Sequence, residues 1–391
     1  MRIYIAHNAY QQSGGEDAVV AAEAELLSSA GHEVTVGIVS NDEINGIRDK
    51  ALAFIDAPGS ARRAAWMSQE LERTNAEVLH VHNFFPLLTP AIHEEAARRG
   101  VAVVQTLHNY RLLCAAATFL RNGEICEKCL GDRRHWGVVH RCYRHSLPGS
   151  IALYRMQEQS RRRRVWHDHV HRLIALSQFA RDKFIAAGLP ADRIVVKPNF
   201  VPGFSGELPT VRRGALFVGR LSREKGVDVL LDAWHQLPDL PLTIVGDGPE
   251  RTRLEAAAPP NVTFTGALTR AEVEARMLSS AVLVVPSIWY ETFGLVVAEA
   301  MAAGLPVAAS RIGALPELIE PGRTGALFET GNRDDLVRAV RASLSGLDAG
   351  HIRRQQQARF SPEANLRQLV DIYSTARDAS GPRQSQHAPQ L

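Results

Sequence analysis

The chain has 391 residues, of which 45% are apolar and 22% are charged. That length exceeds what one compact domain usually holds, so we expect two domains, each with its own core. The 45 basic and 42 acidic residues leave a net charge of only +3, so the overall charge does not favour nucleic-acid binding. No run approaches the about 20 apolar residues of a membrane-spanning helix.

The first residues predict a strand and not a targeting signal. Met1-Arg2 leads directly into the apolar run Ile3 to Ala6 and lacks the small-residue end at which signal peptides are cleaved. We therefore expect a cytoplasmic protein, in which thiols stay reduced and a disulfide framework is uncommon.

Short apolar runs alternate with helix-length segments in the first half of the chain. This alternation predicts a parallel sheet with crossover helices. The expected strands are Ile3 to Ala6, Val34 to Val39, Val78 to Val81, Val101 to Thr106 and Leu173 to Leu176.

A second series of the same kind follows the segment Lys197 to Gly203. Two prolines and a glycine in this segment suit a linker, because they interrupt both helices and strands. The expected strands of the second series are Ala215 to Val218, Leu242 to Val245, Val262 to Phe264, Val282 to Val285 and Val307 to Ala309.

These patterns predict an α/β protein with two facing, Rossmann-like, doubly wound parallel-sheet domains and a cleft between them. Ligands of such sheets bind beyond the carboxyl ends of the strands, so functional residues are expected there. We assign residues 1–200 to the first domain and 201–360 to the second, with the junction near Val201 to Ser205. Residues 361–379 are expected to form a helix that packs back on the first domain, and the polar residues 380–391 a disordered tail.

The segment from Pro286 to Gly304 follows an expected strand and leads from a loop into a helix. Gly294 lies near the helix start, where unpaired N–H groups and a partial positive charge can hold a phosphate. Glu291 lies in the loop and Glu299 about one turn into the helix, so both carboxylates can accept hydrogen bonds from one ligand. In isolation, such a pair is more often a helix-dipole partner and a solvated surface residue.

The context makes this segment resemble the donor site of glycosyltransferase family 4, whose retaining enzymes have the GT-B fold and a Glu-x7-Glu motif. The resemblance covers about residues 1 to 375 and includes bacterial surface-polysaccharide enzymes. Its further motifs are Phe217 to Gly226, Val245 to Glu250, Gly313 to Glu317 and Gly322 to Gly325.

The resemblance assigns the donor site position by position. It implies that a basic pair, Arg220 and Lys225, holds the diphosphate, whose charge grows as it departs. The alternative for this pair is two surface charges at a strand-to-helix turn. Glu299 is implied to bind the ribose. The implied donor-binding residues are Gly14, Gly15, Arg220, Lys225, Gly294, Leu295 and Glu299, and the implied catalytic residues at the transferred sugar are His108 and Glu291.

The segment Ser13 to Asp17 contains Gly14 and Gly15 and precedes a helix expected over Ala18 to Ala30. Adjacent glycines before a helix can bring N–H groups up to a phosphate or sugar, although Gly-Gly alone more often marks a plain turn. The pair resembles the family's first-loop glycines, except that an acid follows at once as Glu16. No Gly-x-Gly-x-x-Gly fingerprint follows a strand, which argues against a dinucleotide dehydrogenase.

Histidines lie at the ends of two expected strands. His82 follows the strand Val78 to Val81, and His108 and Asn109 follow the strand Val101 to Thr106. We expect their polar side chains to point into the cleft, where a neutral His108 imidazole would orient the donor sugar. The alternative, strongest for His82, is a histidine hydrogen-bonded in the core. Candidates for the acceptor side of the cleft are Glu16, His82 and Asn109.

The resemblance also implies how configuration is retained. Attack from the front face lets the leaving phosphate accept the proton of the acceptor, so no dedicated base is assigned. Covalent catalysis by Glu291 is not expected.

All four cysteines fall within an insert of about residues 110–150 that contains a Cys-x-x-Cys. In a reducing compartment this grouping is typical of a closed structural zinc site, with unligated thiols as the alternative. Zinc would fold an insert rich in Arg, His and Gly, whereas no cofactor is expected for catalysis. The candidate ligands are Cys114, Cys126, Cys129 and Cys142.

Arg161 to Arg164 precede Trp166, a basic run with an aromatic that would suit anionic lipid headgroups. A solvated helix face is the alternative.

The sequence as a whole predicts a retaining enzyme that moves a sugar from a nucleotide diphosphate sugar to a lipid-linked saccharide. The expected setting is bacterial exopolysaccharide, capsule or lipopolysaccharide synthesis at the inner face of the plasma membrane. One alternative is a nucleotide-sugar epimerase of GT-B-like fold, which the cysteine insert and the arginine run disfavour. A remote alternative is a zinc-containing nucleic-acid-binding protein, which leaves the implied donor residues unexplained.

Overall fold

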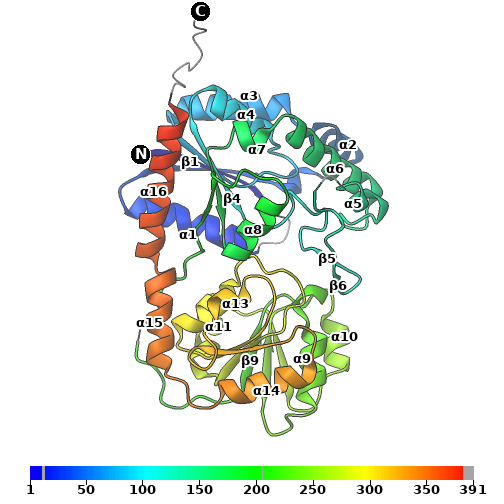
Figure 1. The fold of residues 1–391 in the computed structure, drawn as a ribbon, viewed down its shortest axis with the longest axis vertical. Helices are drawn as coiled ribbons and strands as arrows, with labels where there is room; N and C mark the ends of the chain where they lie inside the picture. Colours follow the sequence, from blue (N-terminus) through cyan, green and yellow to red (C-terminus); the bar gives the residue numbers. More distant parts are fainter. Residues whose placement is uncertain (11–13, 132, 205, 382–391) are drawn as a thin grey trace, which may run out of the picture.

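The computed structural model describes residues 1–10, 14–131, 133–204 and 206–381. These residues form two α/β domains, each built on a six-stranded parallel sheet, and the chain returns to the first domain at its end (Figure 1). The fold class expected from the sequence, two Rossmann-like parallel-sheet domains, is confirmed.

The N-terminal sheet changes its direction of winding between neighbouring strands β1 and β3. In doubly wound sheets, the loops at such a switch point diverge and leave room for a ligand. In their order across the sheet, the strands are β2 (Glu33–Ser40), β1 (Arg2–Ala9), β3 (Val78–Asn83), β4 (Ala102–Leu107), β7 (Arg172–Ala175) and β8 (Ile194–Val196).

Alternating residues of each strand face two separate cores. Ile3 and Ile5 face a cluster that includes residues of α1 and α16, whereas Tyr4 and Ala6 face residues of α3, α4 and α6. The helices of this domain are α1 (Gly15–Ser29), α2 (Ile47–Asp56), α3 (Ala61–Thr74), α4 (Ala91–Arg98), α5 (Trp136–Val139), α6 (Leu147–Arg162), α7 (Val165–Asp168) and α8 (Gln178–Ala186).

The C-terminal sheet has its switch point between β9 and β12. In order across the sheet, its strands are β11 (Val262–Gly266), β10 (Leu242–Val245), β9 (Ala215–Val218), β12 (Val282–Val285), β13 (Val307–Ser310) and β14 (Gly325–Phe328). Its helices are α9 (Val227–Trp234), α10 (Arg251–Ala256), α11 (Arg270–Ser279), α12 (Leu295–Ala302), α13 (Leu315–Leu318) and α14 (Arg333–Ser343).

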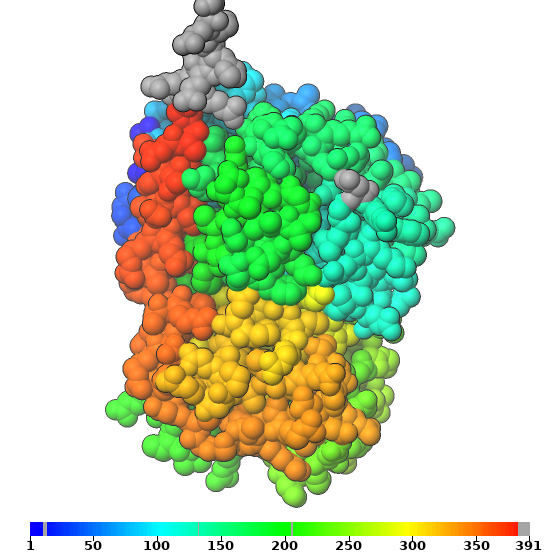
Figure 2. Space-filling view, in the orientation of Figure 1, coloured from blue at the N-terminus to red at the C-terminus, as the bar shows by residue number. Residues whose placement is uncertain are grey.

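The last two helices connect the domains. α15 (Ala349–Phe360) packs on α12 of the C-terminal domain, and α16 (Pro362–Ser380) packs on β4 of the N-terminal domain. In the space-filling view they form one orange-to-red column along the edge of both domains (Figure 2). The apolar side of α16 buries Leu369 and Tyr373 beside Ile5, which anchors the column in the N-terminal core.

The elements differ from the expectation mainly at their ends. The short strands β8 and β14 were not expected, because β8 has three residues and β14 begins at Gly325, in a segment whose glycines also fit a turn. α1 begins at Gly15 and not at Ala18, and α16 continues through Ser380, the first residue of the expected tail. The rest of that tail, residues 382–391, lies outside the described residues, as do Ser13 and Ser205.

The cysteine insert adds a short antiparallel pair, β5 (Leu120–Arg121) and β6 (Glu124–Ile125), and helix α5. Its apolar residues Leu113 and Phe119 belong to the same cluster as Leu79 of the main sheet. The insert therefore shares the core of the N-terminal domain and does not depend on a core of its own.

Candidate active site

A cavity of about 1340 Å³ lies between the two domains. Its N-terminal wall comes from the loops after β1 and β4, and its C-terminal wall from the loops after β9, β10 and β12. These are the carboxyl ends of strands at or beside the switch points, where ligands of such sheets bind. Of the residues singled out in the sequence, Gly14, Gly15, Glu16, His108, Asn109 and Arg220 line this cavity.

Glu291 is 7% exposed and forms a buried ion pair at the edge of the cleft. Its carboxylate accepts hydrogen bonds from Lys225 Nζ at 2.7 Å and from Ser287 Oγ at 2.8 Å. Lys225 Nζ also lies 5.3 Å from the ring centroid of Trp289, which lines the cavity. Gly226 makes this meeting of loops possible, because a Cβ at its φ of 69° would collide with the carbonyl oxygen of Pro286.

The start of α12 faces the start of α1 across the domain boundary. A Cβ built on Gly15 would lie 3.8 Å from Leu295 Cδ2. Gly294 precedes α12 with a φ of 98°, and a side chain there would lie 2.9 Å from Leu315. Two helix N-termini, each with unpaired N–H groups, are thus directed at the same region, which favours an anionic ligand.

Glu299 lies one turn into α12 and is partly buried. Burial raises the pKa of its carboxyl to about 7, and the positive charge of Arg270 only partly opposes this effect. A carboxyl with this pKa changes its charge near neutral pH, which makes it a marker of a functional site.

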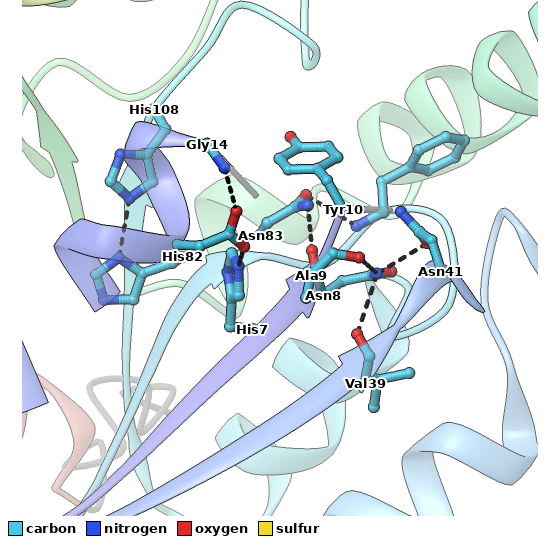
Figure 3. Close-up of polar contacts among 12 residues, drawn as sticks. His7, Asn8, Ala9, Tyr10, Gly14, Val39, Asn41, His82, Asn83 and His108 are labelled. Atoms are coloured by element: carbon cyan, nitrogen blue, oxygen red, sulfur yellow. Dashed lines mark hydrogen bonds and ion pairs between the residues drawn. The ribbon is translucent and has the colours of Figure 1, made fainter. Parts of the chain in front are cut away.

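The imidazole of His108 contacts the imidazole of a second histidine, His82. The His108 Nε2 lies 2.8 Å from His82 Nδ1, and the planes of the two rings are 21° apart (Figure 3). Burial lowers the pKa of His108 to about 3 and that of His82 well below its usual range, so both imidazoles are neutral. One of the two facing nitrogens must therefore carry the shared proton.

The position of the Glu23 carboxylate on α1 indicates which nitrogen carries that proton. Its Oε2 lies 3.5 Å from His82 Nε2, and within the described residues neither atom has a hydrogen-bond partner. Burial alone would raise the pKa of Glu23, but Lys197 Nζ, 2.6 Å away, outweighs burial and holds this pKa below its usual value. We infer that the carboxylate favours a proton on His82 Nε2. His82 Nδ1 then accepts from His108 Nε2–H, which leaves His108 Nδ1 as a hydrogen-bond acceptor.

The two candidate catalytic residues approach each other through one interdomain hydrogen bond. Thr292 Oγ1 donates to the carbonyl oxygen of His108 at 2.9 Å. Thr292 directly follows Glu291, so the bond places the Glu291 loop of one domain against the end of β4 in the other. A second bridge lies nearby, where the Glu317 carboxylate accepts from the backbone N–H of Gln178 at 2.9 Å.

Glu16 lines the cavity together with residues that the sequence analysis did not single out. Burial raises its pKa to about 7, although the Arg111 guanidinium opposes the shift. Arg111 Nη1 donates to the Tyr10 hydroxyl at 3.0 Å, and Asn109 Oδ1 accepts from the Arg111 backbone N–H. Arg111 directly follows the His108-Asn109-Tyr110 segment. Its position after a strand end is the sequence signal from which it could have been identified.

The expectation that His82 points into the cleft is wrong. Residues two apart on a strand share a face, so His80 and His82 both lie under α1 and α16. His82 is 2% exposed, and His80 bonds the Tyr373 hydroxyl at 2.7 Å. Glu23 was also missed. The available signal was its place on an otherwise apolar helix face, four residues after Val19 and four before Leu27.

The basic run at Arg161 to Arg164 is exposed as expected, but Trp166 is not an interfacial aromatic beside it, and contact of the run with lipid stays a prediction. Within the described residues, each of these arginines pairs with an acid, at 2.7 to 3.6 Å, through Glu158, Glu94 and Asp168. Trp166 is 6% exposed and packs on two aromatic rings of the N-terminal core. Among the described helices, none has both the length and the apolar composition that crossing a bilayer requires.

The cysteine thiols are free and lie near one another, but they do not form a ready-made metal site. Cys114 and Cys129 are buried, and Cys126 and Cys142 are half-buried. Among the described residues, one group brings three ligand atoms within 4.8 Å of one another, and it consists of Glu23, His80 and His82. Because Lys197 already neutralises Glu23, that group is better explained as an ion-paired network than as a metal site. Zinc binding by the cysteines stays a prediction.

Comparison with known proteins agrees with this architecture. The family model for "Glycosyltransferase Family 4" matches residues 13–202, and the model for "Glycosyl transferases group 1" matches residues 212–345. A GDP-mannose-dependent alpha-mannosyltransferase of Mycobacterium tuberculosis is 37% identical over 203 residues, covering 48% of this chain and 53% of the relative. The chain thus spans about half the length of this curated relative, and 26% of a sulfoquinovosyl transferase of Arabidopsis thaliana.

Solved structures show the same fold. A sucrose-phosphate synthase from Thermosynechococcus elongatus aligns over 97% of this chain and 100% of its own, with a TM-score of 0.70 and 20% identity. The Anabaena protein HepE in complex with UDP aligns over 96% of this chain and 100% of its own, with a TM-score of 0.66 and 19% identity. The fold and the interdomain cleft define a protein of the GT-B class. With one family model on each domain, the chain belongs to the family 4 and group 1 glycosyltransferases, which confirms the resemblance seen in the sequence.

Proposed function

We propose that this protein transfers a sugar from a nucleoside diphosphate sugar to a saccharide acceptor with retention of configuration. The observation that carries the proposal is the hydrogen bond from Thr292 Oγ1 to the His108 carbonyl oxygen. It joins the loop that carries Glu291 to the strand end that carries His108, and in this proposal a sugar bound at the cleft contacts both residues. Two relatives support the donor class by their names: one is GDP-mannose-dependent, and HepE was crystallised with UDP.

Each group at the cleft has a chemical role in this proposal. The nucleoside diphosphate lies between the starts of α1 and α12, with Arg220 against its phosphates. Glu299 accepts hydrogen bonds from the ribose hydroxyls. Glu291, neutralised by Lys225, contacts the transferred sugar, and His108 Nδ1 accepts a hydrogen bond from a hydroxyl of the same sugar. These contacts fix the sugar relative to the incoming nucleophile.

The reaction needs no separate general base in this arrangement. The acceptor hydroxyl attacks the anomeric carbon on the same face from which the diphosphate leaves. An oxygen of the leaving phosphate accepts the proton of that hydroxyl. Charge that develops on the diphosphate is stabilised by Arg220 and by the helix N-termini. The neutral state of His108 suits a residue that orients a hydroxyl and does not exchange protons near neutral pH.

For the acceptor we propose a lipid-linked saccharide of a bacterial surface polysaccharide, which the enzyme would meet at the cytoplasmic face of the membrane. Support comes from a relative named phosphatidyl-myo-inositol mannosyltransferase, 34% identical over 196 residues. A structural neighbour named lipopolysaccharide outer core galactosyltransferase shares the fold at a TM-score of 0.63.

The test is to incubate the purified protein with a panel of nucleotide sugars and to follow slow donor hydrolysis and thermal stabilisation. We expect one donor to raise Tm and to be hydrolysed, and Arg220→Ala to weaken both effects. The absence of a response to every donor in the panel would refute the proposal.

A further inference from the structure

A second cavity, of about 620 Å³, lies in the N-terminal domain between α2 and α6. Its walls are mostly apolar and include Phe54 of α2, Phe85 after β3, and Ala152 of α6. Nothing in the roles assigned above uses this cavity. Its size suits an apolar chain or ring system, because small-molecule sites typically measure about 300–1,000 Å³.

This cavity borders the reaction cleft. Arg144 lines both the apolar cavity and the interdomain cavity. The Arg111 guanidinium lies 5.9 Å from the ring centroid of Phe85, which lines the apolar cavity, and 5.5 Å from that of Tyr10, which lines the cleft. A ligand anchored among the apolar side chains and long enough to pass Arg144 would enter the cavity that His108 also lines.

The charged groups in the lining are both cationic. They are Lys50 on α2 and Arg144, and no carboxylate lines the described part of the cavity. Within the described residues neither side chain forms an ion pair, unlike the four arginines at Arg161 to Arg164. Two exposed cations beside an apolar wall complement a ligand that combines a hydrocarbon chain with a phosphate.

The outer side of α2 is apolar as well. Ile47 is 89% exposed and Ile55 is 61% exposed. Ile47 lies three residues before Lys50 and seven before Phe54, so it shares a helix face with two residues that line the cavity. Exposed isoleucines at the mouth of an apolar cavity favour entry of a chain that comes from a lipid phase.

We propose that the cavity between α2 and α6 binds the lipid phosphate end of the acceptor. Its hydrocarbon chain lies along Phe54, Phe85 and Ala152, and its phosphate lies between Lys50 and Arg144. The attached saccharide then extends past Arg144 into the cleft. This inference rests on the proposed function, since it names the part of the acceptor that this cavity recognises.

A soluble amphiphile, n-decyl phosphate, tests the cavity by calorimetric titration below its micellar concentration. Ala53→Trp places an indole in the cavity, and Ala51→Trp places the same group on the exposed side of the same helix. We expect Ala53→Trp to weaken binding at least tenfold and Ala51→Trp to leave it within twofold of the unsubstituted protein. Equal binding by both variants would overturn the assignment.

The phosphate contact is tested separately with Lys50→Glu and with Arg48→Glu, an exposed cation two residues earlier on the same helix that does not line the cavity. Lys50→Glu should weaken n-decyl phosphate at least fivefold without changing n-decanol binding, whereas Arg48→Glu should change neither. If n-decanol or inorganic phosphate alone binds the unsubstituted protein as tightly as n-decyl phosphate, the combined site is refuted.

Donor hydrolysis separates this inference from the proposed function. Ala53→Trp should retain donor hydrolysis and the unsubstituted Tm but lose transfer to a lipid-linked acceptor. If the unsubstituted protein hydrolyses no donor, the proposed function is refuted. If it hydrolyses a donor but does not bind n-decyl phosphate, only the cavity assignment is refuted.

Discussion

His82 Nδ1 lies 2.8 Å from His108 Nε2, and this contact connects the candidate catalytic histidine to the buried interior of the N-terminal domain. Behind His82 lies the Glu23 carboxylate, which is neutralised by Lys197. His108 is thus oriented by groups that never touch the substrate, in the way that outer partners orient catalytic imidazoles in other enzymes.

Replacement of His82 by Phe should impair transfer. Without the imidazole, His108 loses its partner and the preference for one tautomer, so a sugar hydroxyl no longer meets an oriented acceptor. Loss of one oriented hydrogen bond in the transition state corresponds to about 1.4 kcal/mol, or about a tenfold fall in kcat/KM. Steady-state kinetics with the identified donor checks this.

A matched control is His93→Phe. His93 is equally buried and bonds Gln105 at 2.8 Å, but it lies away from His108. We expect both variants to lose Tm and only His82→Phe to lose activity beyond what its folded fraction explains. Comparable activity in the two variants would show that the histidine contact is merely structural.

The Glu23 and Lys197 side chains form an ion pair in which both partners are 1% exposed. Lys197→Met would leave a buried carboxylate without compensation, which typically costs about 3–5 kcal/mol of folding stability. The double variant Glu23→Leu with Lys197→Met removes both charges, so it should recover much of the loss. Urea unfolding of the three proteins measures these differences. A single variant as stable as the unsubstituted protein would contradict the assignment.

Glu291→Gln should keep the fold and lose transfer. The amide retains the shape of the carboxylate and can still accept from Ser287, but it leaves Lys225 without its negative partner and changes the contact with the sugar. Removal of one such preorganised contact typically lowers kcat by about 10²–10³. Glu255→Gln, which removes an exposed carboxylate paired with Arg251, is the control and should keep full activity. Full activity in Glu291→Gln would remove Glu291 from the site.

The sequence predicts much of this arrangement, and the features that it does not predict have a physical reason. Buried parallel strands show up as apolar runs, so ten of the twelve main-sheet strands were expected, whereas β8 has only three residues and β14 begins at a glycine that also fits a turn. Residues such as Gly15 and Arg220 were found because the loops that carry them resemble the motifs of the family. Contacts between distant segments carry no local pattern. The pairing of Glu23 with Lys197, 174 residues apart, emerges only when α1 and the end of the N-terminal domain pack together.

The cysteine insert gives a separate prediction. The four thiols are free, and burial, together with the other three thiols nearby, raises the pKa of Cys129. If zinc draws them together as thiolates, its binding would add to the stability of the insert. Metal analysis after purification without added metal should give about one zinc per chain. Cys126→Ser with Cys129→Ser should abolish zinc binding and lower Tm. A metal content near zero, with an unchanged Tm in the presence of a chelator, would establish unligated thiols instead.

Glu299 predicts opposite effects of pH on the free and the donor-bound protein. Burial raises the pKa of this carboxyl to about 7, above the ordinary glutamate value of 4.5 expected in the unfolded chain. Between these values the native state holds the proton more tightly than the unfolded state, so the Glu299 contribution to stability falls as pH rises from 4.5 to 7. Donor binding should respond the other way, because ribose hydroxyls donate to the ionised carboxylate.

If the ionised form alone binds, donor affinity should rise about tenfold between pH 6 and pH 8, as the ionised fraction grows. Glu299→Gln cannot ionise, whereas the nucleotide phosphate and Glu16 ionise in both proteins, so the difference between the two pH profiles isolates the Glu299 carboxyl. Titrations with UDP or GDP, together with Tm measured across the same pH range, check both directions. If the two proteins have parallel pH profiles, Glu299 does not bind the ribose as a carboxylate.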